Sequence, residues 1–429
     1  MRFLIPTGPE RRHLGRFYLS SFIGEMAHLA MPFQVLLVIR YTSAPMLGVL
    51  LFVEGAMEML GDLPSSAWAD RFSRKSVVLA GHVVAALGWL AIPAATLLAP
   101  TPRAIGFGVA FGLLGFGSAL VAGTFDAWVV DNLHAEKQSG LSIYFFGRER
   151  SVASAGGLIA DVLAAGLVLL FHWDIRWFWL VTAAGELAAG AILWRTPEIP
   201  APDDGEEPED EADDPVAEPG SWREALNTVK KGVAVVRQRP ALFAFTLMLI
   251  WATVTVGVWP EGFQTALAQG RLSDWAFPAL EFVVDLIGVL APLTAIGLSR
   301  RLGSRNVLAS MIWLGGGLAV ALWFAPALLV IVVIYLINCA ILDVFDTAAD
   351  DYEQALIPSA TRATTTSALG LLHGFAGLAS AGFLSLLLLF HTASSALALL
   401  GVLSLPAALL LFWRPRNGGE RPTPSEAPR

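Results

Sequence analysis

The stretch Ala67-Trp68-Ala69-Asp70-Arg71-Phe72-Ser73-Arg74-Lys75-Ser76-Val77-Val78-Leu79 decides how the chain is organised. It places one acidic and three basic side chains within six residues, between two long apolar runs. Such a concentration of charge is not stable in hydrocarbon, because nothing there solvates the ions. The stretch therefore predicts a short loop at a membrane face that joins two spanning helices.

The composition also indicates a membrane protein. Of the 429 residues, 55 % are apolar and 15 % are charged, with a mean hydropathy of +0.62, whereas soluble domains carry about 25 % charged residues. The single cysteine, Cys339, lies in an apolar run, which excludes a disulfide framework or a cysteine metal cluster. No basic stripe suggests a nucleic-acid partner. The arginine-rich segment 1–16 precedes an apolar run of full spanning length, so we expect no cleavable signal.

Twelve apolar windows follow one another, each long enough for a spanning helix of about 20 residues. Turn-forming residues separate most of them, as in Thr42-Ser43-Ala44-Pro45. The windows predict an all-α membrane protein with twelve transmembrane helices. They cover residues 17–39, 45–66, 76–98, 104–130, 150–171, 175–194, 241–260, 274–298, 306–324, 326–348, 363–390 and 393–413.

The basic residues predict the orientation. With the N-terminus on the inside, the outer loops hold only Arg40, Arg103, Arg176 and Arg271, which leaves 24 of the 28 basic residues on the inside. Because cytoplasmic loops carry the excess of Lys and Arg, both termini are expected to be cytoplasmic.

Residues 196–219 interrupt the apolar pattern with a proline-rich, acidic run that cannot bury a core. The segment after it is amphipathic and basic, which is typical of a helix lying on the membrane surface. We therefore predict five parts. They are a six-helix bundle over 1–195, a disordered cytoplasmic linker over 196–220, an interfacial helix over 221–240, a second six-helix bundle over 241–415 and a disordered tail over 416–429.

The two predicted bundles repeat each other. The segment Phe125-Asp126-Ala127-Trp128-Val129-Val130-Asp131 recurs as Phe345-Asp346-Thr347-Ala348-Ala349-Asp350-Asp351, at the end of helix four and of helix ten. The charged loop recurs between helices eight and nine as Ser299-Arg300-Arg301-Leu302-Gly303-Ser304-Arg305. Two six-helix halves with weak internal similarity are typical of transporters built from repeats.

The loop residues Asp70, Arg71, Arg74 and Lys75, together with this repeat, resemble the major facilitator superfamily over residues 10–415. Serines stand at 66 and 73, where the family's loop pattern has glycines. The resemblance implies two pseudo-symmetric six-helix bundles that work by alternating access around a mid-membrane cavity. It also implies that the four loop residues form a cytoplasmic gate that closes in the outward-facing state.

Segments 123–133 and 357–367 resemble bacterial exporters of the same superfamily, which implies a drug/proton-antiporter-like protein, expected to be a monomer in a bacterial inner membrane. Two features depart from that subfamily: helix four lacks its buried arginine, and helix five has Ala155-Gly156-Gly157 in place of a Gly-Pro bend.

Ionisable residues inside the predicted helices are nearly all acidic. Each costs at least about 2.5–3.5 kcal/mol at mid-helix, so such residues are expected to face a cavity and to have a function. Glu186 lies in predicted helix six, which the family places outside the central cavity, so Glu186 is not counted among the cavity residues. The candidates for proton or substrate binding are Glu25, His28, Glu54, Glu58, Asp161, Glu281 and Asp285.

These candidates lead to a hypothesis for function. No Lys or Arg lies near the middle of any window, so the acidic cluster cannot stay fully ionised and is expected to bind protons near neutral pH. A cavity of carboxylates also attracts cations. The hypothesis is proton-coupled export of small lipophilic or cationic organic molecules. Glu25, Glu54 and Asp161 would bind proton and cation competitively, driven by the proton gradient and without a cofactor.

Several alternatives stay open. The chain could be an importer or facilitator of a polar solute or a metal cation, or a non-transporting membrane receptor, for which the acidic linker is the only indication. Glu25 and Glu54 could be protonated structural acids. Trp251, in helix seven, is a candidate for stacking on substrate, while other tryptophans near window ends fit interface belts. Enzymatic chemistry is not predicted, because no nucleophile–base pair, phosphate loop or metal-ligand spacing is found.

Overall fold

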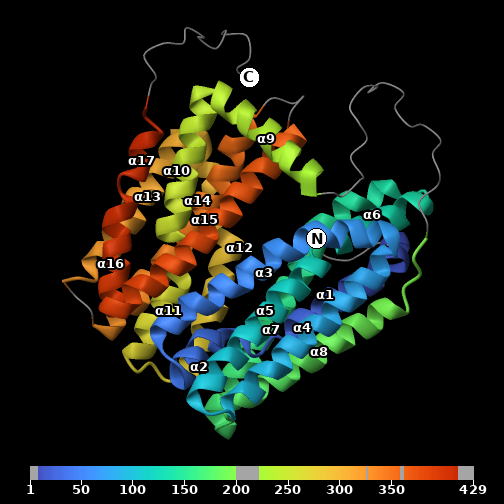
Figure 1. Ribbon diagram of the computed structural model, residues 1–429, viewed down its shortest axis with the longest axis horizontal. Coiled ribbons are helices and arrows are strands. Elements are labelled where there is room, and N and C mark those ends of the chain that lie inside the picture. Colours follow the sequence, from blue (N-terminus) through green and yellow to red (C-terminus); the bar gives the residue numbers. More distant parts are fainter. Residues whose placement is uncertain (1–7, 200–221, 325–326, 358–361, 414–429) are drawn as a thin grey trace.

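The computed structural model describes residues 8–199, 222–324, 327–357 and 362–413, and every element within these ranges is helical (Figure 1). The N-terminal half is built from eight α-helices and three short 3₁₀ helices. In order they are α1 Gly8–Ala27, η1 Met31–Phe33, α2 Gln34–Tyr41, α3 Ala44–Arg71, α4 Arg74–Thr96, α5 Pro100–Val121, α6 Thr124–Ala135, η2 Ser139–Leu141, α7 Ser142–Phe171, η3 Ile175–Trp177 and α8 Phe178–Trp194.

The C-terminal half begins after the undescribed residues 200–221. Its first helix coincides with the predicted interfacial segment, and the others follow the predicted spans. The helices are α9 Trp222–Gln238, α10 Pro240–Val256, α11 Trp259–Gln269, α12 Ala276–Leu302, α13 Ser304–Ala321, α14 Leu328–Leu356, α15 Arg362–Phe390, α16 Ala393–Ser404 and α17 Ala407–Leu410.

Each of the twelve predicted windows corresponds to one helix or to consecutive helices of this series, which confirms the predicted fold class. By length and composition, ten described helices could cross a membrane, or eleven when the two parts of α12, bent by 42° next to Pro292, are taken as one span. α13 is not among them, because Arg305 and Asn306 occupy its first turn. It nevertheless packs between α14 and α16, where the ninth span was expected.

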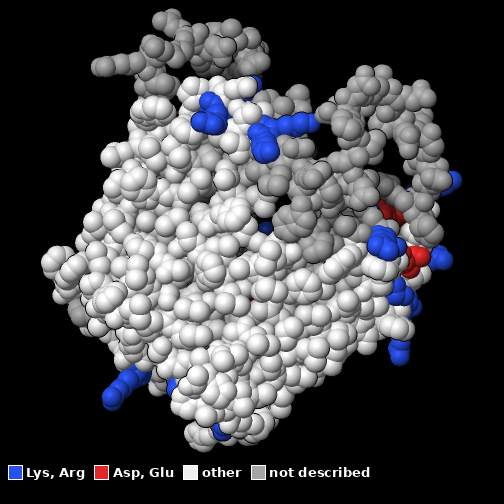
Figure 2. Space-filling view, viewed as in Figure 1, with Lys and Arg blue, Asp and Glu red and all other residues white. Residues whose placement is uncertain are grey.

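The molecular surface supports a membrane location. Figure 2 shows Lys and Arg side chains over α9 and around α6, a few at the lower edge, and an uncharged band between them. We call the face that carries the α3–α4 connection the terminal face. The face that carries the α2–α3 and α11–α12 connections is the opposite face.

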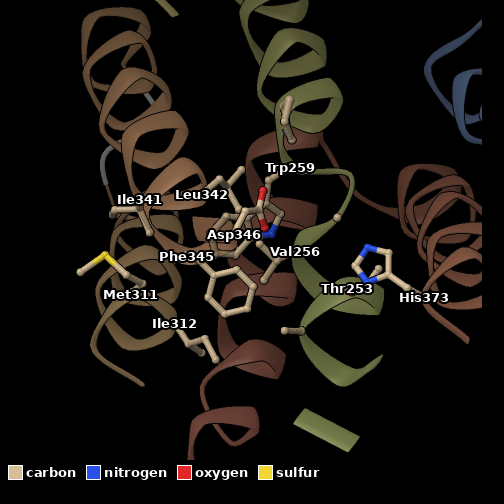
Figure 3. Close-up of a pocket in the computed structure, with 13 residues that line it drawn as sticks. Thr253, Val256, Trp259, Met311, Ile312, Ile341, Leu342, Phe345, Asp346 and His373 are labelled. Carbon is tan, nitrogen blue, oxygen red and sulfur yellow. Dashed lines mark hydrogen bonds between the residues drawn. The ribbon is translucent and has the colours of Figure 1, made fainter. Parts of the chain in front are cut away.

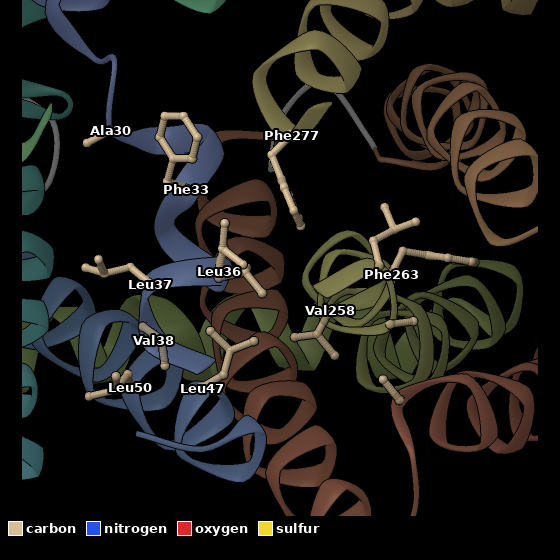
Figure 4. Packing of buried hydrophobic residues seen from close by; sticks show 14 of the residues in the cluster. Ala30, Phe33, Leu36, Leu37, Val38, Leu47, Leu50, Val258, Phe263 and Phe277 are labelled. Atoms are coloured by element: carbon tan, nitrogen blue, oxygen red, sulfur yellow. The ribbon is translucent and has the colours of Figure 1, made fainter. Parts of the chain in front are cut away.

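The two halves meet at the opposite face and diverge toward α9 and α6 (Figure 1). An ion pair of 2.8 Å joins Arg40 to Asp274 across the halves, and the Ser385 hydroxyl donates to the carbonyl of Pro45 at 2.7 Å. Apolar side chains from both halves pack together beside these contacts (Figure 4), including Leu36, Leu47, Val258, Phe263 and Phe277. The protein is therefore closed at the opposite face.

Gly48 permits this closure because α3 and α15 cross at it. A Cβ at residue 48 would lie 2.4 Å from the carbonyl oxygen of Ala381 and 2.7 Å from the Cβ of Ser385. At Gly382, on the same helix as Ser385, a Cβ would meet nothing within 4 Å. The crossing therefore tolerates no side chain at residue 48.

We predict that Gly48→Ala forces the opposite face apart, since the added methyl group cannot fit against the α15 backbone. The measurement is the labelling rate of Gln34→Cys in a Cys339→Ala background, with an impermeant maleimide applied from the opposite face. Gly48→Ala should raise the rate several-fold, and Gly382→Ala should not. Equal rates in the two variants would contradict this account of the closure.

Candidate functional site

A cavity of about 450 Å³ lies between the two halves, next to the closed opposite face. Its N-terminal wall comes from α1, η1, α2 and α7, and its C-terminal wall from α11 and α12. Its polar lining residues are Glu25, His28, Gln34, Asp161, Glu261, Gln264, Glu281 and Asp285. We call it the central cavity. It brings together five of the predicted residues, Glu25, His28, Asp161, Glu281 and Asp285.

A break in the first span positions Glu25 and His28. α1 ends at Ala27, and the chain resumes in η1 with Pro32. The Thr182 hydroxyl of α8 donates to the Ala27 carbonyl at 2.9 Å, and the Ala30 amide donates to the same hydroxyl at 3.4 Å. Because these bonds replace helical ones, the break is held at a fixed place against α8.

Close packing of α7 on α12 brings the acidic residues of the two halves together. A Cβ at Gly157 would lie 3.4 Å from the Oδ2 of Asp285. Asp161 follows one turn later on α7 and is 6 % exposed. Glu281 precedes Asp285 by one turn, so its side chain projects from the same face of α12. The two halves therefore share one acidic site.

Glu281 has two neutral hydrogen-bond donors. The Gln264 amide donates to its Oε1 at 2.6 Å, and the Tyr335 hydroxyl donates to the same atom at 3.0 Å. Both donors come from the C-terminal half. They orient the carboxyl group without neutralising it, since neither carries charge.

The sequence analysis missed Glu261, a fifth carboxyl group of the central cavity. The seventh predicted span ended at residue 260, whereas the structure breaks that span after Val256 and restarts it at Trp259 with Pro260 in the first turn. The Glu261 Oε2 is buried and has no hydrogen-bond partner in the described structure. The Gly257-Val258-Trp259-Pro260 sequence was the available signal for this break.

A second cavity, of about 440 Å³, lies within the N-terminal half and shares Glu25, His28 and Met31 with the central cavity. We call it the N-half cavity. Glu54 lines it, together with two residues that were not candidates, His82 of α4 and Glu186 of α8. Glu186 does not line the central cavity, from which its helix was expected to stand apart, but α8 turns it into the N-half cavity.

Glu186 joins two imidazoles in the N-half cavity. Its Oε1 lies 3.0 Å from the Nε2 of His28, and its Oε2 lies 2.7 Å from the Nδ1 of His82. The side chains of His28, His82 and Glu186 are 22 %, 13 % and 12 % exposed. On its other side, the His28 Nδ1 lies 3.4 Å from the Oε2 of Glu25.

Two other candidates lie away from these cavities. Glu58, one turn after Glu54 on α3, is half-buried, interacts with Ser118 and lines neither of the two cavities. Trp251 is 43 % exposed, and its indole donates to the Leu403 carbonyl at 2.8 Å. This bond fastens α10 to α16, and Trp251 lines neither of the two cavities, so its stacking on substrate stays a prediction that their linings do not support.

The predicted repeat is visible as a pair of cavities. A cavity of about 270 Å³ in the C-terminal half is lined by Phe345 and Asp346, and Phe125 lines the N-half cavity at the equivalent place. Figure 3 shows Asp346 among apolar side chains, including Val256 and Leu342. His373 lies across this cavity, with its Nδ1 3.4 Å from the hydroxyl of Thr253. The C-terminal cavity therefore holds far fewer ionisable groups than its counterpart.

The basic residues of the α3–α4 connection contact the N-terminal half. Arg74 forms a 2.5 Å ion pair with Asp131 of α6, as expected for a helix-end pair. The Lys75 Nζ donates to the Thr196 carbonyl at 2.8 Å, and the Arg71 guanidinium lies over the Phe72 ring at 5.6 Å. The side chain of Asp70, the fourth predicted gate residue, lies outside the described part of the structure.

The predicted linker begins with a bound segment. The Glu198 carboxylate accepts from the backbone amides of Arg74 at 2.7 Å and Lys75 at 3.4 Å, at the start of α4. Asn132 donates to the Pro197 carbonyl and accepts from the Ile199 amide, each at 2.9 Å. Residues 196–199 are therefore packed against the gate connection, and the rest of the predicted linker, 200–220, lies outside the described residues.

We predict that Glu198→Ala destabilises the protein by about 0.5–2 kcal/mol, the usual cost of losing a helix cap. The cause is the loss of the carboxylate that accepts from two amides at the start of α4. Thermal unfolding in detergent measures the effect, with Glu198→Gln as the matched control because it keeps an acceptor oxygen. A melting temperature unchanged in Glu198→Ala would show that this contact contributes nothing.

Two helical bundles closed over a polar cavity at one face define a membrane carrier that works by changing which face is closed. The model of the Major Facilitator Superfamily matches residues 14–381. The chain therefore belongs to this superfamily and is a secondary transporter of a small molecule. Membership of this family indicates a transporter rather than an enzyme.

Solved structures show the same fold at low sequence identity. The nucleoside transporter NupG matches with a TM-score of 0.69 and 15 % identity, over 92 % of this chain and 97 % of its own. A bacterial homologue of the iron transporter ferroportin, in an inward-facing state, matches at 0.62 and 17 %, over 92 % and 98 %. The D-xylose–proton symporter matches at 0.65 and 13 %, over 93 % and 97 %. No curated protein matches the sequence.

Proposed function

We propose that this protein exchanges protons for small cationic organic molecules and exports them across a bacterial inner membrane, with both termini in the cytoplasm. The observation that carries the proposal is the central cavity, whose lining includes five carboxyl groups from both halves. Among the described residues that line it, none is Lys or Arg.

The charge of the cavity supports a cationic substrate. Five ionised carboxylates in a low-dielectric site repel one another, and either protons or a cation can neutralise them. Its volume of about 450 Å³ lies within the range of small-molecule sites, about 300–1,000 Å³. Met31, Pro32 and Val35 add an apolar wall that suits the organic part of a lipophilic cation.

Competition between proton and cation gives the direction of transport. When both neutralise the same carboxylates, a cavity that faces the acidic side loses its cation and takes up protons. On the other side the protons leave and a cation enters. An inward proton gradient therefore drives outward movement of the cation, with Glu25, Asp161, Glu261, Glu281 and Asp285 as the shared ligands. Glu54 contributes from the adjacent N-half cavity.

The gate residues fit the same cycle. In this structure the opposite face is closed, and the basic residues of the α3–α4 connection contact groups of the N-terminal half. These residues are Arg71, Arg74 and Lys75. Alternating access requires the terminal face to close in the other state. We propose that Asp70 and these three basic residues then contact the C-terminal half.

A polar solute is the second candidate. Gln34 and Gln264 line the central cavity and offer amide hydrogen bonds that a neutral substrate could use. Among the structural neighbours, the D-xylose–proton symporter is named for a sugar. A metal cation is less well supported, because among the described residues no three His, Cys, Asp or Glu side chains are placed to hold one.

The test uses purified protein in proteoliposomes that contain a pH-sensitive dye. Tetraphenylphosphonium, a lipophilic cation, is added under an imposed pH gradient. We predict proton flux in exchange for the cation. The flux should fall at least about ten-fold in Asp161→Asn and in Glu261→Gln, since each removes a buried ligand worth more than about 1.4 kcal/mol.

Trp251→Phe is the matched control, because Trp251 lines neither cavity and the flux should stay unchanged in this variant. Cation movement without proton flux would restrict the carboxylates to substrate binding in a facilitator. Uptake of a neutral sugar or nucleoside, but not of the cation, would favour the second candidate.

A further inference from the structure

We propose that the proton exchanged for substrate is carried on His28, with Glu186 as its counter-charge and His82 as the residue that positions Glu186. This inference rests on the proposed proton-coupled function and assigns its proton site. Within the proposed exchange, it assigns the proton that leaves when a cation binds at the cavity carboxylates to a histidine beside them.

His28 lies between two carboxyl groups. Its Nε2 lies 3.0 Å from Glu186 on α8, and its Nδ1 lies 3.4 Å from Glu25 on its own helix. Both ring nitrogens therefore face an acceptor. A neutral imidazole can donate from only one nitrogen, whereas the imidazolium donates from both. The geometry favours the charged form of His28.

Glu186 is held in a fixed position between His28 and His82. α8 approaches α1 closely beside it, since a Cβ at Gly185 would lie 2.0 Å from the Cβ of Ala27. His82 holds the second oxygen of Glu186 at 2.7 Å. An ionised Glu186 accepts one hydrogen bond on each oxygen, so it can remain charged in a site where it is only 12 % exposed.

The surroundings of His28 are acidic. Every described ionisable side chain that lines the two cavities around His28 is acidic, apart from His28 and His82 themselves. From α3, α7, α11 and α12 these are Glu54, Glu149, Asp161, Glu261, Glu281 and Asp285. With one proton, the group of His28, Glu186 and His82 is neutral, and without it the group carries a negative charge. Low dielectric favours the neutral group until a cation arrives.

The exchange step then follows from repulsion. His28 carries a hydrogen on each nitrogen when the central cavity holds no cation. A cation that binds at Glu25 comes to lie beside the positive imidazolium. The Nδ1 proton leaves to water in the N-half cavity, which His28 also lines, while the Nε2–H bond to Glu186 remains. One positive charge enters and one proton departs, so charge balances.

His28, Glu186 and His82 have different roles, and these roles can be distinguished experimentally from a purely structural hydrogen-bond network. His28 binds the proton, and Glu186 stabilises the proton-bound form. His82 is a positioning residue that acts through Glu186. Loss of Glu186 or His82 should therefore weaken proton coupling while cation binding at the central carboxylates persists. A structural defect would reduce both together.

The experiment measures protons released per tetraphenylphosphonium bound by the purified full-length protein, in a weakly buffered solution with a pH indicator. Wild type should release one proton per cation. Glu186→Gln and His82→Leu should release almost none, and their cation affinity should lose its dependence on pH between about 6 and 8. His82→Gln, which keeps a donor to Glu186, should restore most of the release.

His373→Gln is the matched control, since His373 lies in the cavity of the other half. Full proton release by Glu186→Gln, together with loss of release in Asp161→Asn, would overturn this inference and leave the proposed exchange on the carboxylates. Cation binding by wild type without proton release would overturn both.

A second measurement needs no substrate. Nitrogen NMR of histidine-labelled protein distinguishes a charged imidazole from a neutral one, and His28→Gln identifies the signal among the seven histidines. We expect a charged His28 at neutral pH in wild type and a neutral one in Glu186→Gln. A neutral His28 in wild type would contradict the inference.

Discussion

This structure depends on the free-energy cost of burying several carboxylates between two halves that must separate. Each acidic group loses hydration when the opposite face closes, and the nearby acids of the other half add repulsion. Under the proposed exchange, the closed state is therefore stable only when protons or a cation neutralise the cavity. This constraint couples the binding of charge to the contact between halves, because contacts such as Arg40–Asp274 form only when α2 and α12 approach.

Small residues allow the acidic groups to reach their positions. Gly48 lets α3 cross α15, Gly157 lets α7 approach Asp285, and Gly185 lets α8 approach the end of α1. A larger residue at any of these crossings would move a helix away from its neighbour. In lipid, where helix association depends on close packing rather than on the hydrophobic effect, such crossings contribute directly to the fold.

The sequence was sufficient for the fold and for part of the site. Apolar length predicted the spans, and acidic residues at mid-depth predicted Glu25, Asp161, Glu281 and Asp285, because charge in hydrocarbon needs a cavity. Glu261 could not be found from the sequence, because the seventh span was expected to end at residue 260. In the structure that span is a broken helix, which restarts at Trp259. From the sequence, Glu186 was rejected and His82 overlooked, because pairing between α4 and α8 depends on helix rotation, which length and composition do not determine. Helix rotation also places Trp251 against Leu403 of α16, away from both cavities.

The two halves have diverged in what their internal cavities hold. Both keep the phenylalanine of the Phe-Asp repeat at the equivalent wall, Phe125 in one and Phe345 in the other. In the N-terminal half the cavity contains Glu54, His82 and Glu186, whereas its counterpart has apolar walls around Asp346 and His373. Only the N-half cavity shares residues with the central one. Alternating access needs symmetry in the motion of the helices. The proposed proton exchange needs only one half to carry the titrating groups, and this asymmetry is compatible with both requirements.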